Sequence, residues 1–172
     1  MANTTKITRQ PENISLLENN KFKFTIPNLS WAVYFCQSAT LPGVGTTSAI
    51  QYTPFHDMKR HGDRLVYQPL VITALIDEDL YTWEQTFNWL QSITTPQGFQ
   101  QYGKGVDYGI YNDGILEFNK NSNLSNLRIK FHNCVITDLG QIQMQSDVTE
   151  PEQLLSDITI DYDTFTVERL DK

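Results

Sequence analysis

The chain has 172 residues, of which 40% are hydrophobic, 12% aromatic and 19% charged, and its formal net charge is −7. These values are typical of a globular chain that forms one domain around its own core. The acidic balance excludes a protein that holds nucleic acid by neutralising phosphates, because such binding needs clustered lysine and arginine. The longest apolar run, residues 70–76, is far shorter than the roughly 20 residues that span a bilayer, so no membrane association is expected.

The first 20 residues are polar and weakly patterned, which predicts an N-terminal arm followed by one domain over residues 21–172. The start of the chain has no apolar leader, so we expect a protein made in a cytoplasm. Cys36 and Cys134 lie in apolar stretches, and we expect both to be buried free thiols.

Alternation of apolar and polar residues predicts a series of strands. Pro69 predicts a bulge or an edge, because proline cannot donate to a strand ladder, and a phase change at Thr164 predicts a second bulge. The predicted strands cover residues 21–26, 31–39, 46–52, 65–76, 127–136 and 157–167.

One helix is predicted after the acidic residues 77–79, which suit the positive end of a helix dipole, with Asp77 and Asp79 as candidate caps. Leu80, Trp83, Phe87 and Leu90 form its apolar stripe, whereas Trp89 lies off that stripe and is a candidate surface contact.

Residues 97–126 are rich in Gly, Asn, Asp and Tyr and are interpreted as an insertion. Within it, Asn112-Asp113-Gly114 predicts a hairpin turn, with residues 114–118 as the returning strand. The expected fold is mainly β: an antiparallel β-sandwich or open barrel with one flanking α-helix.

No residue set supports catalysis or metal binding. His56 and His61 match no metal-ligand spacing, and His132 lies on the polar face of a strand, where a solvated or hydrogen-bonded histidine is expected. The acidic groups are explained by helix capping and by exposed strand faces. We therefore predict no catalytic residue, no metal and no cofactor. A β-sandwich binding module using Tyr102, Tyr108 and Tyr111 is an alternative, and a small hydrolase is a weaker one.

Several motifs in fixed order carry a resemblance to a known family. They are FCQSATLPGVGTTSAI, a basic MKRHGDR, a strand, DEDL, a helix ending in FNWLQSITTP, and a final ITIDYDTFTV. In this order they resemble the tail tube proteins of contractile-tailed bacteriophages, over roughly residues 22–169.

The resemblance implies a non-enzymatic virion protein, made in the host cytoplasm, whose homohexameric rings stack around a channel for DNA ejection. Strands of neighbouring subunits would join one ring-wide barrel, and DNA would pass without specific binding. The implied partners are the tail sheath, the baseplate hub or tube initiator, and the tape-measure protein. A baseplate or tail-end protein of the same fold, forming one ring, is the alternative.

Three groups of site residues follow from the resemblance. The segment 46–64 resembles the family's long loop that reaches the adjacent ring, and an acidic lumen would repel DNA phosphates. The candidates are Asp57, Lys59, Arg60, Asp63 and Arg64 for contacts between rings, Thr159, Asp161 and Asp163 for the lumen, and Glu84, Asn88 and Trp89 for the outer helix on the sheath side.

Overall fold

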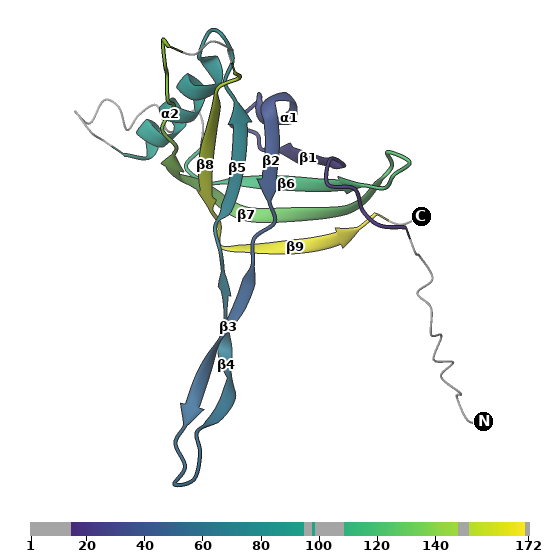
Figure 1. The fold of residues 1–172 in the computed structure, drawn as a ribbon, viewed down its shortest axis with the longest axis vertical. Coiled ribbons are helices and arrows are strands. Elements are labelled where there is room, and N and C mark those ends of the chain that lie inside the picture. Colours follow the sequence, from purple (N-terminus) through teal and green to yellow (C-terminus); the bar gives the residue numbers. More distant parts are fainter. Residues whose placement is uncertain (1–14, 95–97, 99–108, 148–151, 171–172) are drawn as a thin grey trace.

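The computed structural model describes residues 15–94, 98, 109–147 and 152–170 (Figure 1). Its elements are β1 (Phe22–Thr25), α1 (Ala32–Phe35), β2 (Cys36–Thr40), β3 (Val44–Gln51), β4 (Met58–Tyr67), β5 (Leu70–Leu75), α2 (Tyr81–Ile93), β6 (Asn112–Asn119), β7 (Ser125–Leu139), β8 (Leu155–Asp161) and β9 (Thr164–Arg169).

Two antiparallel sheets share the long strand β7. The first sheet has the order β1-β6-β7-β9, and the second has the order β2-β5-β8-β7. Residues 127–132 of β7 pair with β9, whereas residues 135–139 pair with β8. Between them Asn133 adopts a left-handed backbone conformation with φ of 56°, which asparagine tolerates better than most residues. The two sheets therefore cross, as Figure 1 shows.

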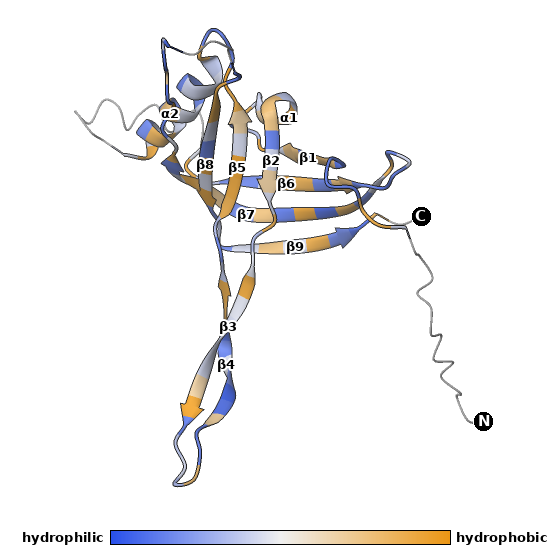
Figure 2. Ribbon diagram, viewed as in Figure 1, coloured by the Kyte–Doolittle hydropathy of each residue, from blue (hydrophilic) through white to orange (hydrophobic). Residues whose placement is uncertain are grey.

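The core lies between the crossing sheets, and strand alternation explains its composition. Hydrophobic and hydrophilic residues alternate along β6, β7 and β8 (Figure 2), so that one face of each strand is apolar. The buried side chains are Phe24, Ile26, Leu29, Trp31, Ala32, Leu70, Ile72, Ala74, Trp89, Leu116, Ile129, Phe131, Cys134, Ile136, Ile158 and Ile160. The predicted mainly β, antiparallel fold with a flanking helix is confirmed, as an open arrangement.

The segment 46–64, which contains the strand predicted over 46–52 and resembles the family's long loop, is part of a β-hairpin. β3 and β4 pair with each other and project from the body of the domain (Figure 1). Their register shifts where residues 62–64 oppose Thr47 alone. A Cβ atom on Gly62 would lie 1.7 Å from the carbonyl oxygen of Thr47, so this close crossing requires glycine. The bulge increases the local twist of the hairpin.

Three predicted strands are divided differently in the structure. The expected strand over 31–39 begins as α1, because the amide of Phe35 donates to the carbonyl oxygen of Trp31 at 2.9 Å, one helical turn away. Gln68 and Pro69 separate β4 from β5, as the missing proline donor suggested. The expected bulge near Thr164 is a corner at Tyr162 and Asp163, where the chain leaves the second sheet at the end of β8 and joins the first sheet as β9.

The predicted inner face of the helix is wrong except at Leu90, which is half-buried and packs against the core. The buried residues of α2 are Thr82, Thr86, Trp89 and Ser92, while Phe87 is exposed. Leu80, which began the predicted stripe, precedes the helix with a left-handed φ of 56° and therefore has no helical register. The hydroxyls of Thr86 and Ser92 donate to carbonyl oxygens within the helix at 2.8 and 2.7 Å, which allows these polar residues to be buried.

The predicted helix cap is present, whereas the hairpin turn predicted within residues 97–126 is not. The carboxylate of Asp77 accepts hydrogen bonds from the amides of Tyr81 at 3.1 Å and Thr82 at 2.8 Å, which confirms the cap. Asn112-Asp113-Gly114 is part of β6 and not a hairpin turn, and residues 114–118 are a strand as predicted. Tyr102 and Tyr108 lie outside the described residues.

Candidate assembly interface

The second sheet has no strand partner at either edge within the described residues. β2 pairs with β5 alone, and residues 135–139 of β7 pair with β8 alone. The outer edges of β2 and β7 therefore present backbone donors and acceptors that another chain can pair with. Because all the pairings in this sheet are antiparallel, β2 and β7 run in opposite directions.

One face of the second sheet is turned away from the core, and we call it the open face. The four strand segments, residues 36–40, 70–75, 135–139 and 155–161, contain three aspartates and no basic residue. On this face the hydroxyl of Ser38 donates to that of Thr73 at 2.9 Å, and the hydroxyl of Thr73 donates to the carboxylate of Asp157 at 2.8 Å. This chain of bonds links three strands and orients an anionic surface.

The structure places the predicted lumen residues at two locations. Thr159 is half-buried and Asp161 is exposed, and both alternate with the core residues of β8 on the open face. Asp163 lies in the corner before β9, where its carboxylate accepts a hydrogen bond of 2.6 Å from the side-chain amide of Asn133.

Sequence reasoning left two open-face carboxylates out of the candidate site. Asp157 alternates with Thr159 and Asp161 on β8, so the period of two could have identified it. Asp138 is opposite Thr159 only because the register of β7 shifts between Ile136 and Asp138. A bulge of this kind leaves no signal in local alternation.

All five residues predicted to contact another ring lie on the hairpin and are exposed. Asp57 is in the tip, and Lys59, Arg60, Asp63 and Arg64 follow on β4. None of these charged groups forms an ion pair within the described part of the chain, and Arg60 donates a hydrogen bond of 3.1 Å to Gln51. Their charges are therefore available to a partner.

The outer helix candidates separate into two groups. Glu84 and Asn88 are exposed on α2. Trp89 is 0% exposed and belongs to the core, so it is not a surface contact of the subunit. On the outer side Trp83 and Phe87 stack with their ring centroids 5.1 Å apart and their planes 6° apart, which makes them the aromatic surface of this helix.

The polar face of the first sheet contrasts with the open face because it carries charges of both signs. Lys23, Glu117, Arg128 and Glu168 lie side by side across four strands. The guanidinium of Arg128 lies 2.8 Å from the carboxylate of Glu117. Opposite charges on neighbouring strands stabilise a sheet modestly. The two basic and two acidic residues of this row balance each other in charge.

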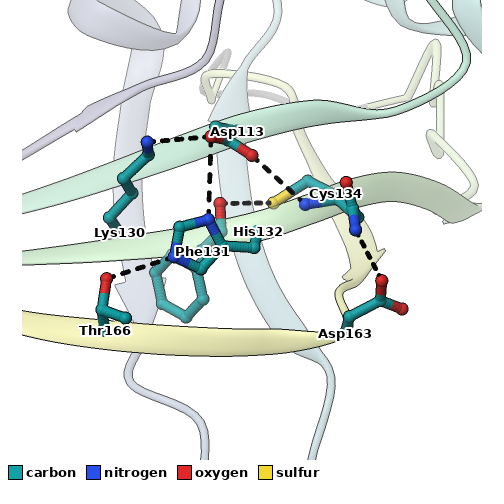
Figure 3. Close-up of polar contacts among 8 residues, drawn as sticks. Asp113, Lys130, Phe131, His132, Cys134, Asp163 and Thr166 are labelled. Carbon is teal, nitrogen blue, oxygen red and sulfur yellow. Dashed lines mark hydrogen bonds and ion pairs between the residues drawn. The ribbon is translucent and has the colours of Figure 1, made fainter.

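A second polar group on the first sheet surrounds His132 (Figure 3). The ammonium of Lys130 lies 3.0 Å from the carboxylate of Asp113, and His132 lies between Asp113 and the hydroxyl of Thr166, at 3.7 and 3.2 Å. The hydrogen bond from Lys130 holds the pKa of Asp113 below its ordinary value. The predicted hydrogen-bonded role of His132 is confirmed.

The cysteines are free, as predicted, with Cys134 buried and Cys36 half-buried. Burial raises the pKa of both thiols to about 11, which suppresses the reactive thiolate. Within the described residues no group of three or more His, Cys, Asp or Glu side chains could hold a metal ion. No helix there is long and apolar enough to cross a membrane.

A cavity of about 1220 Å³ adjoins the open face. Thr73, Asp157 and Thr159 of the sheet line one side of it. The chain that follows β7 and the chain that precedes β8 line the other side, through residues that include Gln141, Met144, Gln145, Glu152 and Gln153.

Comparison with known proteins identifies the fold. No family model matches the sequence, and no curated protein matches it. A chain of the anti-feeding prophage tube-terminating cap is similar with a TM-score of 0.66 and 14% identity, covering 95% of this chain and 99% of that one. A chain of the anti-feeding prophage baseplate, determined with 6-fold symmetry, has a TM-score of 0.65 and 8% identity, covering 90% and 96%.

A chain of the PVC extracellular contractile injection system, from its sheath-tube complex, is similar with a TM-score of 0.60 and 12% identity, covering 90% of this chain and 93% of that one. The chain thus has the fold found in the tube, cap and baseplate assemblies of contractile injection systems. The resemblance seen in the sequence is confirmed at the level of the fold.

Proposed function

We propose that the chain is a non-enzymatic structural subunit of a contractile tail tube, in which six copies close into a ring and rings stack around a channel. The observation that carries this proposal is the pair of open edges on the second sheet. Since β2 and β7 run in opposite directions, β2 of one copy can pair antiparallel with β7 of the next. Repetition around a ring would leave no free edge in the barrel.

The open face supports a role as the channel wall. Asp138, Asp157 and Asp161 give it negative charge without a basic residue in the strands. A wall of this sign repels DNA phosphates, so DNA would pass through without binding. Thr159 and Asp161 are the wall residues that we propose from β8, with Asp163 at its rim. The virion of a bacteriophage is the proposed location.

The outside of the tube would present α2. Glu84 and Asn88, together with the stacked Trp83 and Phe87, are the surface that we propose for the tail sheath. The baseplate hub or tube initiator and the tape-measure protein are the other proposed partners. A baseplate or tail-end ring of the same fold uses the same edges, and it differs in forming one ring without continued stacking.

Electron microscopy and light scattering of the purified chain test the proposal. We expect hexameric rings and tubes, with single rings indicating an end protein. Gln37→Pro removes a backbone donor at the position where β2 shifts its register against β5, and should block ring closure. Near-ultraviolet circular dichroism would show that the variant is folded. A folded wild-type chain that stays monomeric at all concentrations would refute the function.

The channel wall has a separate test. Tubes of Asp161→Lys should bind short duplex DNA at low salt and release it as salt rises, whereas wild-type tubes should not bind. Glu84→Lys, which adds the same charge on α2, is the control. Equal DNA binding by both variants would mean that the open face does not line the channel.

A further inference from the structure

We propose that two β-bulges, one at Gln37 in β2 and one at Thr137 in β7, form a register lock between neighbouring copies, through which a β7 edge accepts only β2 of another copy of this chain. The inference rests on the proposed function and goes beyond it, because it states which residues lie opposite each other and which strands the edge rejects. Three features support it: the length of the free edge, the position of the bulges, and the matching of the two faces.

The free edge of β7 is a slot of fixed length. β8 and β9 follow one another along one edge of β7, and β6 occupies the other edge. The pairing of β6 reaches Cys134, which is opposite Asn112, and β7 ends at Leu139. Within the described residues this leaves positions 135–139 free. β2 has 5 residues, the same length, and is itself bounded by α1 before it and by Pro42 soon after it.

Each of the two strands has one extra residue. The register of β2 against β5 shifts between Cys36 and Ser38, so Gln37 is extra in β2. The register of β7 against β8 shifts at Thr137 in the same way. Both extra residues are exposed. A bulge interrupts the alternation of faces, so a regular strand that pairs with a bulged one matches it on one side of the bulge only. Two bulges that lie next to each other compensate.

One register brings together residues of the same face. The residues of these strands that pack in or against the core are Cys36, Ala39, Ile136 and Leu139. The register begins with Cys36 opposite Leu139. Ala39 then lies opposite Ile136, so core-side residues meet at both positions. Directly opposite residues of an antiparallel pair share one face, so the core would continue without a break from one copy to the next.

The same register is consistent on the open face and at the bulges. Thr40 lies opposite Val135, which is itself paired with Asp161 on the open face. Gln37 lies opposite Asp138, and a side-chain amide there can donate to the carboxylate. Asp138 forms no ion pair in the described part of the chain, so its carboxylate can accept this bond.

Other registers and other strands fit less well. A shift by one residue places at least one core-side residue opposite an open-face residue. A shift by two residues toward β6 brings Ala39 against Asn112, which already holds the edge beyond the slot. The opposite shift places Ser38 of the open face against Leu139 of the core side. A strand without a bulge loses the match beyond Thr137. The edge therefore selects β2 of a second copy.

Deleting the bulge residues tests the lock. Deletion of Gln37 keeps every pair of β2 with β5, and deletion of Thr137 keeps every pair of β7 with β8, because neither residue has a partner in those ladders. Each single deletion should raise the concentration needed for ring closure by roughly tenfold or more. The double deletion should restore closure, because both strands then alternate regularly. Light scattering would measure closure, and circular dichroism would verify folding.

Oxidative crosslinking reads the register directly. Cys36 is a free thiol, so Leu139→Cys alone should give disulfide-linked neighbours in assembled rings treated with copper–phenanthroline, since directly opposite Cβ atoms lie about 4.5–5.5 Å apart. Thr137→Cys, two residues away on the same strand, is the matched control and should stay unlinked, as should the wild type. Thr40→Cys/Val135→Cys, with Cys36→Ser, should also crosslink and reports on the open face.

The outcomes separate the lock from the proposed function. Rings in which neither predicted pair crosslinks, or in which Thr137→Cys crosslinks instead, would overturn the register while the function stands. A folded double deletion that assembles no better than the single deletions would overturn the compensation of the bulges. Absence of rings in the wild type would refute both proposals.

Discussion

The hydroxyl of Tyr162 donates a hydrogen bond of 2.8 Å to the carbonyl oxygen of Gln68. Tyr162 lies at the corner between β8 and β9, and Gln68 lies between the hairpin and β5. The ring of Tyr162 also packs edge-on against Phe131, with centroids 4.9 Å apart, and lies 6.0 Å from Tyr67. This contact therefore fixes the base of the hairpin to the corner that joins the two sheets.

Tyr162→Phe should lower the free energy of unfolding by about 1 kcal/mol, because it removes one hydrogen bond and keeps the ring. Hydrogen exchange should quicken at the hairpin base, in residues 65–68. Tyr34→Phe is the control, since Tyr34 is 84% exposed and should behave like the wild type. Equal stability of the two variants would show that the bond does not anchor the hairpin.

The same tyrosine predicts a pH dependence. Burial, with smaller effects from Tyr67, Cys134 and Asp161, raises the pKa of Tyr162 to about 12. The folded state then keeps the proton between about pH 10 and 12, whereas the unfolded chain releases it. The stabilisation is complete below about pH 10 and is lost as the pH rises through about 12. The free energies of unfolding of the wild type and Tyr162→Phe, measured by denaturation across this window, should therefore converge.

Gly62→Ala should distort the hairpin and impair stacking, because its Cβ would lie 1.7 Å from the carbonyl oxygen of Thr47. The core lies outside the hairpin, so the thermal midpoint of the body should change little. Gly45→Ala is the matched control in the same hairpin, since nothing lies within 4 Å of its added Cβ. Tube formation would be followed by sedimentation. Normal tubes of Gly62→Ala would contradict a requirement for this bulge.

Trp89→Ala should lower the free energy of unfolding by about 3–5 kcal/mol, the cost of removing a large buried side chain. Trp83→Ala on the outer side of α2 should cost clearly less, because Trp83 stacks on Phe87, which is 38% exposed. Urea denaturation of both variants compares the two faces directly. The reverse order would mean that α2 packs through the apolar stripe predicted from its sequence.

Asp77→Ala should destabilise the domain by about 0.5–2 kcal/mol through loss of the helix cap. Burial tends to raise the pKa of Asp77, but hydrogen bonds from Thr82 and Tyr81 outweigh it and lower the pKa. The stabilisation is thus present above about pH 3.9, the value of an unfolded aspartate, and is lost as the pH falls through the lower folded pKa. Denaturation curves of the wild type and Asp77→Ala at pH 7 and pH 2 measure this loss. Asp79→Ala is the matched control and should keep the wild-type stability at pH 7.

Local patterns were sufficient for the class of fold and for much of the strand content. Phe22 to Ile26, Leu127 to Phe131 and Asp157 to Asp161 alternate with a period of two, and each lies in or overlaps a strand whose apolar side faces the core. This worked because alternation in a half-buried strand depends on backbone geometry alone. The cap at Asp77 was equally local, since its partners are four and five residues away.

Contacts between distant segments decided the rest. The buried side of α2 is the side that carries Trp89. The other buried residues on that side are Thr82, Thr86 and Ser92, which are polar, so the sequence showed no apolar stripe there. Asp138 joined Asp157 on the open face through a register shift between two strands. The chain leaves the second sheet after Asp161 and joins the first as β9, which pairs with the part of β7 that precedes Asn133. The sequence by itself determined which residues prefer water, and only the tertiary structure decided which of them share one surface, because that depends on how strands far apart in the chain are paired.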